Sequence, residues 1–536
     1  ILMLYIISFN LNTNKKNNYM QDPTKTNNPY CIQKSTINEY PPIFCFGQNK
    51  SNEQRISHKN GAPIVNFAGP IAPIIPLTLL RNGFDSDFGK NNTKFILNYG
   101  SPRNLEFYQS LSAGQMANQV PGSFAFSRKD YLMRSLENMK PQWDVSPSSF
   151  ILPGDLEIVQ QHMSENPGKW YIYKPAMAAR GENIKLIQSL SQIDPKQEAV
   201  IQEYLMNPLL IDGHKFDLRI YFLVTSVNPL VVYMYKEGLA RFAASPYTNP
   251  TSRNANKAQI HLTNFEVNKN SKNKRQFRVK RNLSEILDQL SANPRQFQHP
   301  DLTRMSPSSL KSHLIGQIRT ALQVSLTATY KQQLEFARRV PAIHWFPRRF
   351  FGYYGADVIF DAQGKAKILE INASPSLVGV KGVDLELKQQ LMEDFLNLVG
   401  IPANFDAGKL LVPEMGLKGK AKSFFEDIKF ERFYDEFSDQ IKDQKDENQI
   451  NFEFKKKLER PNNDKIENDN KNVENNEKEM SYMKKYEEMV LAQIKDENTR
   501  MGNFERILPD ANCFENQGYL NELVREYIEN EKSANL

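Results

Sequence analysis

Two carboxylates and one amide converge in a predicted β-hairpin. Asp357 lies in its first strand, a turn begins at Asp361, and Glu370 and Asn372 lie two apart in the returning strand. Residues two apart in a strand share a face, and pairing of Asp361 with Ala366 would place Asp357 opposite Glu370. Burying these groups alone would be costly, whereas their oxygens suit Mg²⁺ bound to nucleotide phosphates. We therefore predict a magnesium site formed by Asp357, Glu370 and Asn372.

A second charged set alternates along one predicted strand. Lys215, Asp217 and Arg219 project from one face, while Phe216 and Leu218 project from the other. A charged face beside a buried one favours a ligand site. The alternative is an edge strand that uses charge to avoid pairing with another chain.

A lysine at the end of a predicted strand precedes a loop of small residues. Lys174 ends the strand, and Arg180 and Gly181 lie in the loop. Small residues let backbone N–H groups approach a phosphate, and the lysine adds positive charge. The segment is not a Walker loop, because GxxxxGK[ST] is absent. Taken alone, it would better suit a surface hairpin with solvated Lys174 and Arg180.

Polar side chains in two further segments could complete a site. Arg241 could hold an acyl phosphate or a carboxylate with two parallel hydrogen bonds. Thr263 and Asn264 offer neutral hydrogen bonds near a nucleotide. We expect His261 to be a packed structural histidine rather than a general base, and no Ser, His and Asp grouping indicates triad hydrolysis.

Short β-branched and aromatic runs predict the strands that hold these side chains. They cover residues 170–174, 199–202, 219–225, 230–235, 356–360 and 366–372. Helical periodicity is clear over 310–337 and 385–398, so the predicted fold class is mixed α/β or α+β. Residues 1–55 are predicted to be disordered, and the region beyond residue 421 to be exposed helix and linker.

Charge divides the chain into a basic body and an acidic tail. The 536 residues include 68 Lys and Arg and 61 Asp and Glu, a net charge of +7. Residues 421–536 hold 19 and 28 of these, a net −9, which leaves +16 for residues 1–420. A basic body favours a polyanionic partner, and the alternative is a mixed solvated surface.

The cysteines and the apolar run at the start of the sequence argue against disulfide-rich, zinc-binding and membrane-inserted proteins. The three cysteines, Cys31, Cys45 and Cys513, are widely spaced and form no CxxC or Cys/His cluster. We therefore predict that the protein has neither a disulfide framework nor a zinc site. We also predict that it resides in a reducing compartment. The apolar run from Ile1 to Phe9 is shorter than the roughly 20 residues of a membrane helix, so we expect no signal peptide and no membrane insertion.

The order of the motifs resembles the tubulin tyrosine ligase-like family, over roughly residues 62–402. The motifs are Lys174-Pro, Arg180-Gly181, Gln202-Glu-Tyr-Leu205, Lys215-Phe-Asp217-Leu-Arg219, Glu237-Gly-Leu-Ala-Arg241-Phe242, His261-Leu-Thr-Asn264, Asn268-Lys269, Asp357 and Leu369-Glu370-Ile371-Asn372-Ala-Ser-Pro-Ser376. The stretch from Phe216 to Tyr247 and the Asn-Ala-Ser-Pro-Ser ending look most similar to the tubulin polyglutamylases.

This resemblance implies an ATP-grasp fold, in which ATP lies between two β-containing lobes. The implied division is a disordered segment at 1–55, an N-terminal α/β domain at 56–147, a central ATP-grasp lobe at 148–207, a C-terminal ATP-grasp lobe at 208–402, and an acidic, partly helical or disordered tail at 403–536.

The resemblance also implies roles for individual residues. Those expected to contact or line the ATP site are Lys174, Arg180, Gly181, Gln202, Glu203, Tyr204, Leu205, Lys215, Asp217, Thr263 and Asn264. Asp357, Glu370 and Asn372 would hold Mg²⁺. Those expected to meet the incoming glutamate or the acyl phosphate are Arg219, Arg241 and Lys269. Glu266 stands where polyglutamylases commonly carry Ser, which leaves the identity of the donor amino acid open.

The implied activity is ATP-dependent addition of glutamate to side-chain carboxylates of tubulin C-terminal tails, through an acyl phosphate. A basic body would attract such acidic tails. The alternatives are a glycine ligase, a glutamylase of another acidic protein, or a catalytically silent microtubule-binding scaffold. No motif for nucleic-acid binding is present. We expect a cytoplasmic monomer on the cytoskeleton, including cilia and basal bodies.

Overall fold

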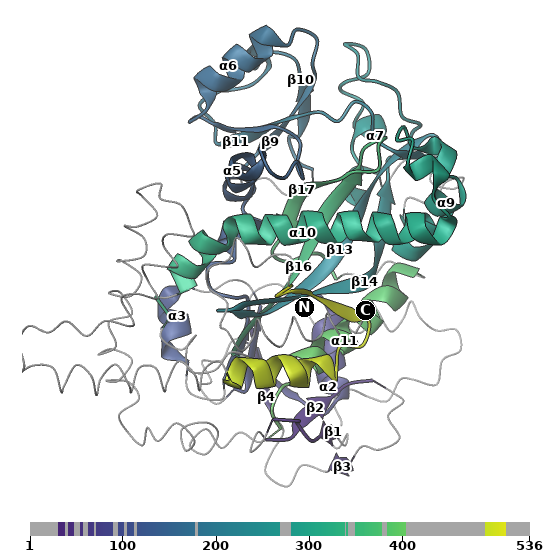
Figure 1. Cartoon of the computed structure of the whole chain (residues 1–536). Helices are drawn as coiled ribbons and strands as arrows, with labels where there is room; N and C mark the ends of the chain where they lie inside the picture. The colour runs from purple at the N-terminus through teal and green to yellow at the C-terminus, as the bar shows by residue number, and fades with distance from the viewer. Residues whose placement is uncertain are drawn as a thin grey trace, which may run out of the picture.

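A computed structural model gives the fold of most of the chain (Figure 1). It describes residues 30–37, 41–47, 54–56, 63–68, 71–88, 95–100, 104–111, 115–176, 181–268, 280–337, 339–340, 349–377, 383–403 and 488–510. Within these ranges, no helix is both long and apolar enough to cross a membrane.

One large sheet runs through the molecule and joins a parallel half to an antiparallel half. The parallel strands are β5 (Asp85–Phe88), β4 (Ile64–Ala68), β6 (Leu97–Gly100) and β7 (Met116–Asn118), in that order. β7 pairs in parallel with β16 (Phe350–Phe360), which starts the antiparallel half. The segments 56–147 and 208–402, predicted as an N-terminal domain and a C-terminal lobe, therefore both contribute strands to this one sheet.

The antiparallel half carries most of the predicted chemistry. From β16 the order continues through β13 (His214–Val227), β14 (Leu230–Phe242) and β15 (Lys280–Asn282), and β17 (Ala366–Asn372) pairs with the other side of β16. These long strands contain the β-branched and aromatic runs predicted from the sequence. The predicted mixed α/β class is confirmed.

Alternation along β13 divides the hydrophobic core in two. Phe222 and Val224 face a core that includes α10 (Pro307–Ala337), whereas Tyr221 and Leu223 face a second core that includes α11 (Val383–Val399). Figure 1 shows α10 crossing the sheet that β13, β14 and β16 form. Both predicted helices are confirmed, with bounds within three residues of those expected.

A smaller lobe lies beyond the main sheet (Figure 1). Its strands run in the order β10 (Lys185–Ile187), β9 (Tyr171–Pro175), β11 (Ala199–Glu203) and β8 (Ser149–Leu152). Its helix α6 (Leu156–Glu165) buries Val159 in a core shared with all four of these strands. The strands and the helix of this lobe lie between Ser149 and Glu203.

Short elements connect and cover these layers. They are α2 (Ile74–Arg81), α3 (Leu105–Ser110), α4 (Phe124–Ser127), α5 (Lys129–Met139), η1 (Leu190–Gln192), β12 (Leu210–Ile211), α7 (Ala258–His261), α8 (Phe265–Asn268), α9 (Leu283–Ala292), η3 (Pro294–Gln296) and η4 (Leu302–Arg304).

A three-stranded sheet near the N-terminus corrects two predictions. Its order is β2 (Ile43–Cys45), β1 (Tyr30–Gln33) and β3 (Gln54–Ile56), so these parts of residues 1–55 are ordered. Cys31 and Cys45 are opposite each other and form a disulfide, with Cα atoms 5.2 Å apart. Our prediction that excluded a disulfide is wrong, because strand pairing aligned two cysteines whose spacing carries no recognisable signature.

The C-terminal segment 488–510 is part of the body. Residues 488–498 are helical, and β18 (Phe504–Leu508) pairs antiparallel with the first half of β14. The predicted exposed helix and linker is therefore wrong for this segment, which buries apolar side chains against the second core. The rest of the predicted tail, 404–487 and 511–536, lies outside the described residues.

Buried acids join this segment to distant parts of the chain. Glu497 accepts hydrogen bonds from the hydroxyls of Thr225 (3.0 Å) and Tyr233 (2.8 Å) in the main sheet. Asp496 accepts from the Ser35 hydroxyl (3.0 Å) and the Thr36 backbone N–H (2.6 Å). Both acids are fully buried, so these bonds satisfy groups that water cannot reach. The N-terminal and C-terminal segments are thereby bonded to each other.

Candidate functional site

Lys174 reaches into the space between the small lobe and the main sheet. It is in β9, two residues after Ile172, and both side chains line the same cavity. The Lys174 ammonium donates to Gln202 Oε1 at 2.8 Å, and Gln202 Nε2 donates to Ser149. Burial lowers the pKa of Lys174 to about 8, although the nearby Glu370 carboxylate opposes the shift.

Lys215 forms the second cation of the cavity. Its ammonium donates to the Tyr204 hydroxyl at 3.0 Å and lies 4.1 Å from the centre of that ring. Burial lowers the pKa of Lys215 to about 7, while Asp217 acts in the opposite direction. The Tyr204 oxygen is 3.1 Å from Nδ1 of His261, a buried histidine whose pKa burial lowers to about 4. This histidine is neutral and hydrogen-bonded, as expected for a structural residue.

Two guanidinium groups and two carboxylates form a buried cluster on one face of the main sheet. Arg241 donates from Nε to Asp217 (2.8 Å) and from Nη2 to Asp357 (2.7 Å), and Arg219 Nε donates to Asp357 (2.5 Å). Strand register explains the contacts, because Arg241 is opposite Asp217 and Arg219 is opposite Asp357. The predicted charged face of β13 is confirmed.

Opposing effects set the charges in this cluster. Burial would raise the pKa of Asp357, but Arg219 and Arg241 more than compensate, and the pKa is well below its usual range. Burial would lower the pKa of Arg241, but Asp217 and Asp357 raise it. The oppositely charged partners thus outweigh burial and keep Asp357 and Arg241 ionised.

A β-bulge brings Glu370 opposite Asp357. We predicted this pair from a pairing of Asp361 with Ala366, but Phe360 is the residue that pairs with Ala366. A register shift after Val358 then restores the predicted Asp357–Glu370 pair. The pair is thus confirmed, although the assumed register of the turn was wrong.

The carboxylates of this hairpin fit a magnesium–nucleotide complex. Glu370 lies near Asn372, which donates from Nδ2 to Glu370 Oε1 at 3.3 Å. Asp357 is engaged by guanidinium groups, but each carboxylate oxygen has two lone pairs and can also bind a metal. No group of three His, Cys, Asp or Glu side chains in the described ranges forms a metal site by itself. Magnesium needs only one or two carboxylates when phosphates supply further oxygens.

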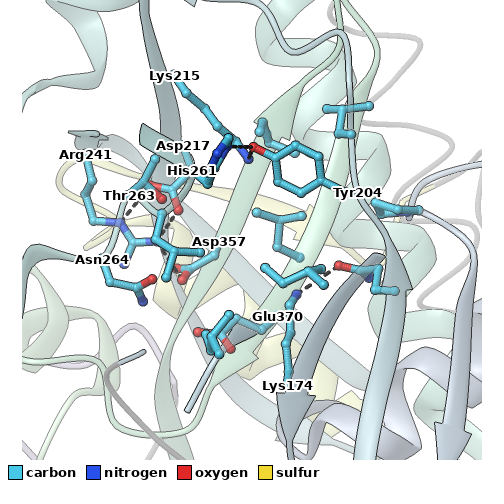
Figure 2. Close-up of a pocket in the computed structure, with 18 of the residues that line it drawn as sticks. Lys174, Tyr204, Lys215, Asp217, Arg241, His261, Thr263, Asn264, Asp357 and Glu370 are labelled. Atoms are coloured by element: carbon cyan, nitrogen blue, oxygen red, sulfur yellow. Dashed lines mark hydrogen bonds and ion pairs between the residues drawn. The ribbon is translucent and has the colours of Figure 1, made fainter. Parts of the chain in front are cut away.

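One cavity gathers most of the predicted residues (Figure 2). The predicted residues that line it are Lys174, Gln202, Glu203, Tyr204, Leu205, Lys215, Asp217, Arg241, Thr263, Asn264, Asp357 and Glu370. It encloses about 80 Å³, less than the roughly 300 Å³ or more of a typical ligand pocket. The cations around it are already bonded, Lys174 to Gln202, Lys215 to Tyr204, and Arg241 to Asp217 and Asp357, so a nucleotide must displace some of these contacts.

Three other predicted residues are near the cavity without lining it, and two lie outside the described residues. Arg219 and Asn372 contact lining residues, and Gly181 adopts a φ of +85° with Asn264 next to it. A Cβ at Gly181 would approach Asn264 Cγ to 3.3 Å, so a small residue suits this close approach. Arg180 and Lys269 are the two that the structure does not describe.

Sequence reasoning missed the apolar walls and a lysine. Ile172, Ile184 and Leu369 line the cavity and could sandwich a planar base. Alternation in β9 could have identified Ile172, two residues before Lys174. Lys129, at the start of α5, lies 3.8 Å from Glu370 Oε2, and no pattern in the sequence connects the two.

Glu203 has a different environment from the other lining residues. Its carboxylate is 2.8 Å from His162 Nε2 and accepts from Lys169 Nζ at 2.9 Å. Burial would raise the pKa of Glu203, but these two partners lower it. The side chain is therefore bound within the small lobe.

Comparisons with known proteins agree with this geometry. A model of the tubulin-tyrosine ligase family matches residues 108–407. Human tubulin monoglutamylase TTLL4 is 29% identical over 373 residues, which cover 67% of this chain and 29% of that protein. Mouse tubulin polyglutamylase TTLL13 is 32% identical over 308 residues, which cover 55% of this chain and 36% of that protein. Mouse tubulin polyglutamylase TTLL5 is 30% identical over 351 residues, which cover 62% of this chain and 25% of that protein. The matched regions span about a quarter to a third of these relatives.

Proposed function

Because the chain belongs to the tubulin-tyrosine ligase family, we propose that it is an ATP-dependent ligase that joins glutamate to side-chain carboxylates of tubulin C-terminal tails. The observation that carries this proposal is the buried cluster of Asp217, Arg219, Arg241 and Asp357 facing Glu370. Such a cluster can hold phosphates and carboxylates at one place. An ATP-grasp arrangement, with nucleotide between the small lobe and the main sheet, is part of this proposal.

Lys174 and Lys215 would hold the nucleotide phosphates. Both ammonium groups are buried, and in the structure each bonds a neutral side-chain oxygen, of Gln202 and Tyr204 respectively. A phosphate oxygen would replace these partners and form stronger, charge-assisted bonds. Negative phosphates would also raise the lowered pKa of each lysine and keep both protonated.

The proposed reaction has two steps, each of which balances. An oxygen of the acceptor carboxylate attacks the γ-phosphorus, the bond to the β-phosphate oxygen breaks, and ADP leaves. The amine of glutamate then attacks the acyl carbon, inorganic phosphate leaves with the acyl oxygen's bonding pair, and the amine loses a proton. An amide joins glutamate to the acceptor.

The chain's own residues contribute mainly position and charge. Magnesium, held by Asp357, Glu370 and Asn372, would neutralise phosphate charge. Arg241 and Arg219 would bind the acyl phosphate and orient the incoming amino acid, with Asp217 fixing the Arg241 guanidinium. Preorganised charges of this kind typically contribute about 10²–10³-fold in rate each.

The charge of the main body supports the proposed acceptor. The net +16 of residues 1–420 would steer acidic tails to the site. We further propose a monomer that acts in the cytoplasm on the cytoskeleton, including cilia and basal bodies. A glycine ligase and a glutamylase of another acidic protein remain candidates within the same chemistry.

The test is incorporation of labelled glutamate into purified microtubules, with labelled glycine and tyrosine in parallel. Wild type should incorporate glutamate only when ATP and Mg²⁺ are present. Glu370→Gln should reduce the rate by about 10²–10³-fold while the melting temperature stays close to that of wild type.

The matched control is Glu488→Gln, an exposed residue of the C-terminal helix, which should keep full activity. Full activity in Glu370→Gln would refute the metal assignment. No incorporation of any amino acid by wild type would refute the ligase, and binding to microtubules without turnover would then support a scaffold.

A further inference from the structure

Gln119 occupies an unusual position at the junction of the two halves of the main sheet. It directly follows β7, the strand that pairs with β16. The residue is buried, with 2% of its surface exposed, and its φ is +81°. A positive φ is uncommon for residues other than glycine, and residues held in this way gather at functional sites.

Three contacts hold the backbone around Gln119. The Gln119 carbonyl accepts from the Tyr108 hydroxyl at 3.2 Å, and the Val120 N–H donates to the Tyr354 hydroxyl at 3.4 Å. Gly122 lies so close to α10 that a Cβ there would overlap a backbone oxygen of that helix. These contacts keep Gln119 in a conformation that it would rarely adopt by itself.

The side-chain amide of Gln119 bonds the segment that follows β17. Its Nε2 donates to the carbonyl oxygen of Ala373 at 3.1 Å and lies 3.4 Å from the Ser374 hydroxyl oxygen. Pairing of β17 with β16 ends at Asn372. Ala373 therefore lies beyond the strand ladder, and its carbonyl oxygen is held by this amide instead.

This bond places Gln119 directly behind the oxygen ligands proposed for Mg²⁺. Asn372 comes immediately before Ala373, and its side chain is bonded to Glu370. A rotation of the strand end would move the Asn372 side chain relative to Asp357. Metal sites depend on support of this kind, because the groups behind the ligands set where the ligand atoms point.

The other end of the amide has no partner among the described residues. Gln119 Oε1 is buried and accepts no hydrogen bond from any of them. The orientation of the amide is fixed all the same, because the Ala373 carbonyl oxygen can only accept and so must face Nε2. An unpaired buried acceptor and a positive φ are both unfavourable. Stability alone therefore does not explain a glutamine at this position.

We propose that Gln119 is a positioning residue, which fixes the end of β17 so that Glu370 and Asn372 present their oxygens to Mg²⁺. This inference rests on the proposed function, in which the hairpin of β16 and β17 holds the metal. Gln119 itself touches neither the metal nor a substrate. Its loss should weaken metal binding and leave the chemistry of the loaded site intact.

The test is Gln119→Asn in the full chain. Asparagine also tolerates a positive φ, but its amide is one methylene too short to reach Ala373. The Mg²⁺ concentration that gives half the maximal rate of glutamate incorporation should rise about tenfold or more, as for other residues that support metal ligands. At saturating Mg²⁺ the rate should return to within about threefold of wild type.

A second readout does not depend on turnover. Mn²⁺ prefers the same oxygen ligands as Mg²⁺, and electron paramagnetic resonance measures its free concentration. In the presence of a non-hydrolysable ATP analogue, the Kd of Mn²⁺ should rise about tenfold or more in Gln119→Asn.

Two further variants separate the bond from the backbone. Gln119→Gly adopts a positive φ most readily and removes the amide, so its metal affinity should fall as in Gln119→Asn. Gln119→His also tolerates a positive φ, and its ring N–H can donate in place of the amide. This variant should restore part of the metal affinity.

Gln323→Asn is the matched control. Gln323 is likewise a buried glutamine, and its Nε2 donates to the backbone carbonyl oxygen of Ile507 at 2.7 Å. That bond joins α10 to β18 rather than to β17. Gln323→Asn should lower the melting temperature and leave both metal measurements unchanged.

An unchanged Mg²⁺ requirement and Mn²⁺ Kd in Gln119→Asn and Gln119→Gly would overturn this inference and leave the ligase standing. An equal loss of metal affinity in Gln323→Asn would also overturn it, because it would indicate a general effect of destabilisation. An inactive wild type would instead refute the proposed function, and the Mn²⁺ Kd values would still decide whether Gln119 positions a metal site.

Discussion

Asp357 on the charged face of the main sheet and Glu497 in the docked C-terminal segment are both buried, but they are satisfied differently, whereas Asp496, next to Glu497, pairs with Arg500. On the sheet face, Asp357 accepts from the guanidinium groups of Arg219 and Arg241. In the C-terminal segment, Glu497 accepts from the hydroxyls of Thr225 and Tyr233. Asp357 is balanced by two positive charges that could also bind a phosphate. Glu497 accepts from neutral hydroxyl groups.

This difference separates groups that serve chemistry from groups that serve architecture. A guanidinium or ammonium group can release a carboxylate and bind a phosphate instead, because the carboxylate and the phosphate are both anions. Hydroxyl donors from a rigid sheet fix one acid in one position. We therefore expect substitutions on the sheet face to affect turnover most, and substitutions at the docked segment to affect stability alone.

The largest expected effect is that of Arg241→Met. It should reduce ligation more than about 100-fold, because the group that would bind the acyl phosphate is lost. It should also lower the free energy of unfolding by about 3–5 kcal/mol, because Asp217 and Asp357 stay buried without that partner. Initial rates and urea denaturation measure the two effects.

Arg319→Met is the matched control from the other region. Arg319 of α10 pairs with Glu505 of β18, and both side chains are 35% exposed. A partly exposed pair contributes at most about 1 kcal/mol, so activity should persist. Equal loss of activity in both arginine variants would contradict the separation of the two regions.

A smaller effect, on stability alone, is expected for Glu497→Gln. Glu497 Oε2 accepts from both hydroxyls and Oε1 accepts from Gln493 Nε2, so an amide, which has a single oxygen, leaves either the hydroxyls or Gln493 without this acceptor. The free energy of unfolding should fall by about 1–3 kcal/mol. The rate per folded molecule should match wild type, and a lower rate would show that the docked segment takes part in catalysis.

The smallest expected effect is a pH dependence of nucleotide binding. Lys215 binds phosphate only when protonated, and its pKa in the free protein is lowered by burial to about 7. Affinity should therefore be highest below pH 7 and fall as the pH rises through 7, by up to about tenfold per unit. Calorimetric titration of an ATP analogue from pH 6 to pH 8.5 measures this.

Lys215→Arg should remove the decline that begins near pH 7, because a guanidinium stays charged throughout the range, and leave the decline near pH 8 that Lys174 causes. A wild-type profile that is flat, or that rises with pH, would show that Lys215 is not a phosphate ligand. Glu497→Gln keeps Lys215 and lies in the other region, so its pH profile should match that of wild type.

The sequence predicted the sheet face well because its signal is local. Alternation of period two places Lys215, Asp217 and Arg219 on one face whatever the rest of the chain does. The hairpin joins Asp357 and Glu370 within 13 positions, so even a mistaken turn register led to the right pair. Roles within the site remain predictions, as do those of Arg180 and Lys269.

The docked segment and the disulfide could not be predicted because their partners are remote. Asp496 bonds Ser35 across 461 positions, and Glu497 bonds Thr225 across 272. In the sequence, residues 488–498 form a charged amphipathic helix that would look the same in solvent. Cys31 and Cys45 likewise show their relationship only after β1 and β2 pair.

The late position of β18 in the chain has a consequence for synthesis. The strand it covers, β14, ends at Phe242, about 260 residues before β18 begins. At about 5–20 residues per second, a ribosome needs roughly 13–50 s to make that stretch. During this interval the first half of β14 is an open edge that another chain could pair with. A nascent chain therefore needs a protected edge, such as a chaperone provides, until residue 508 has emerged.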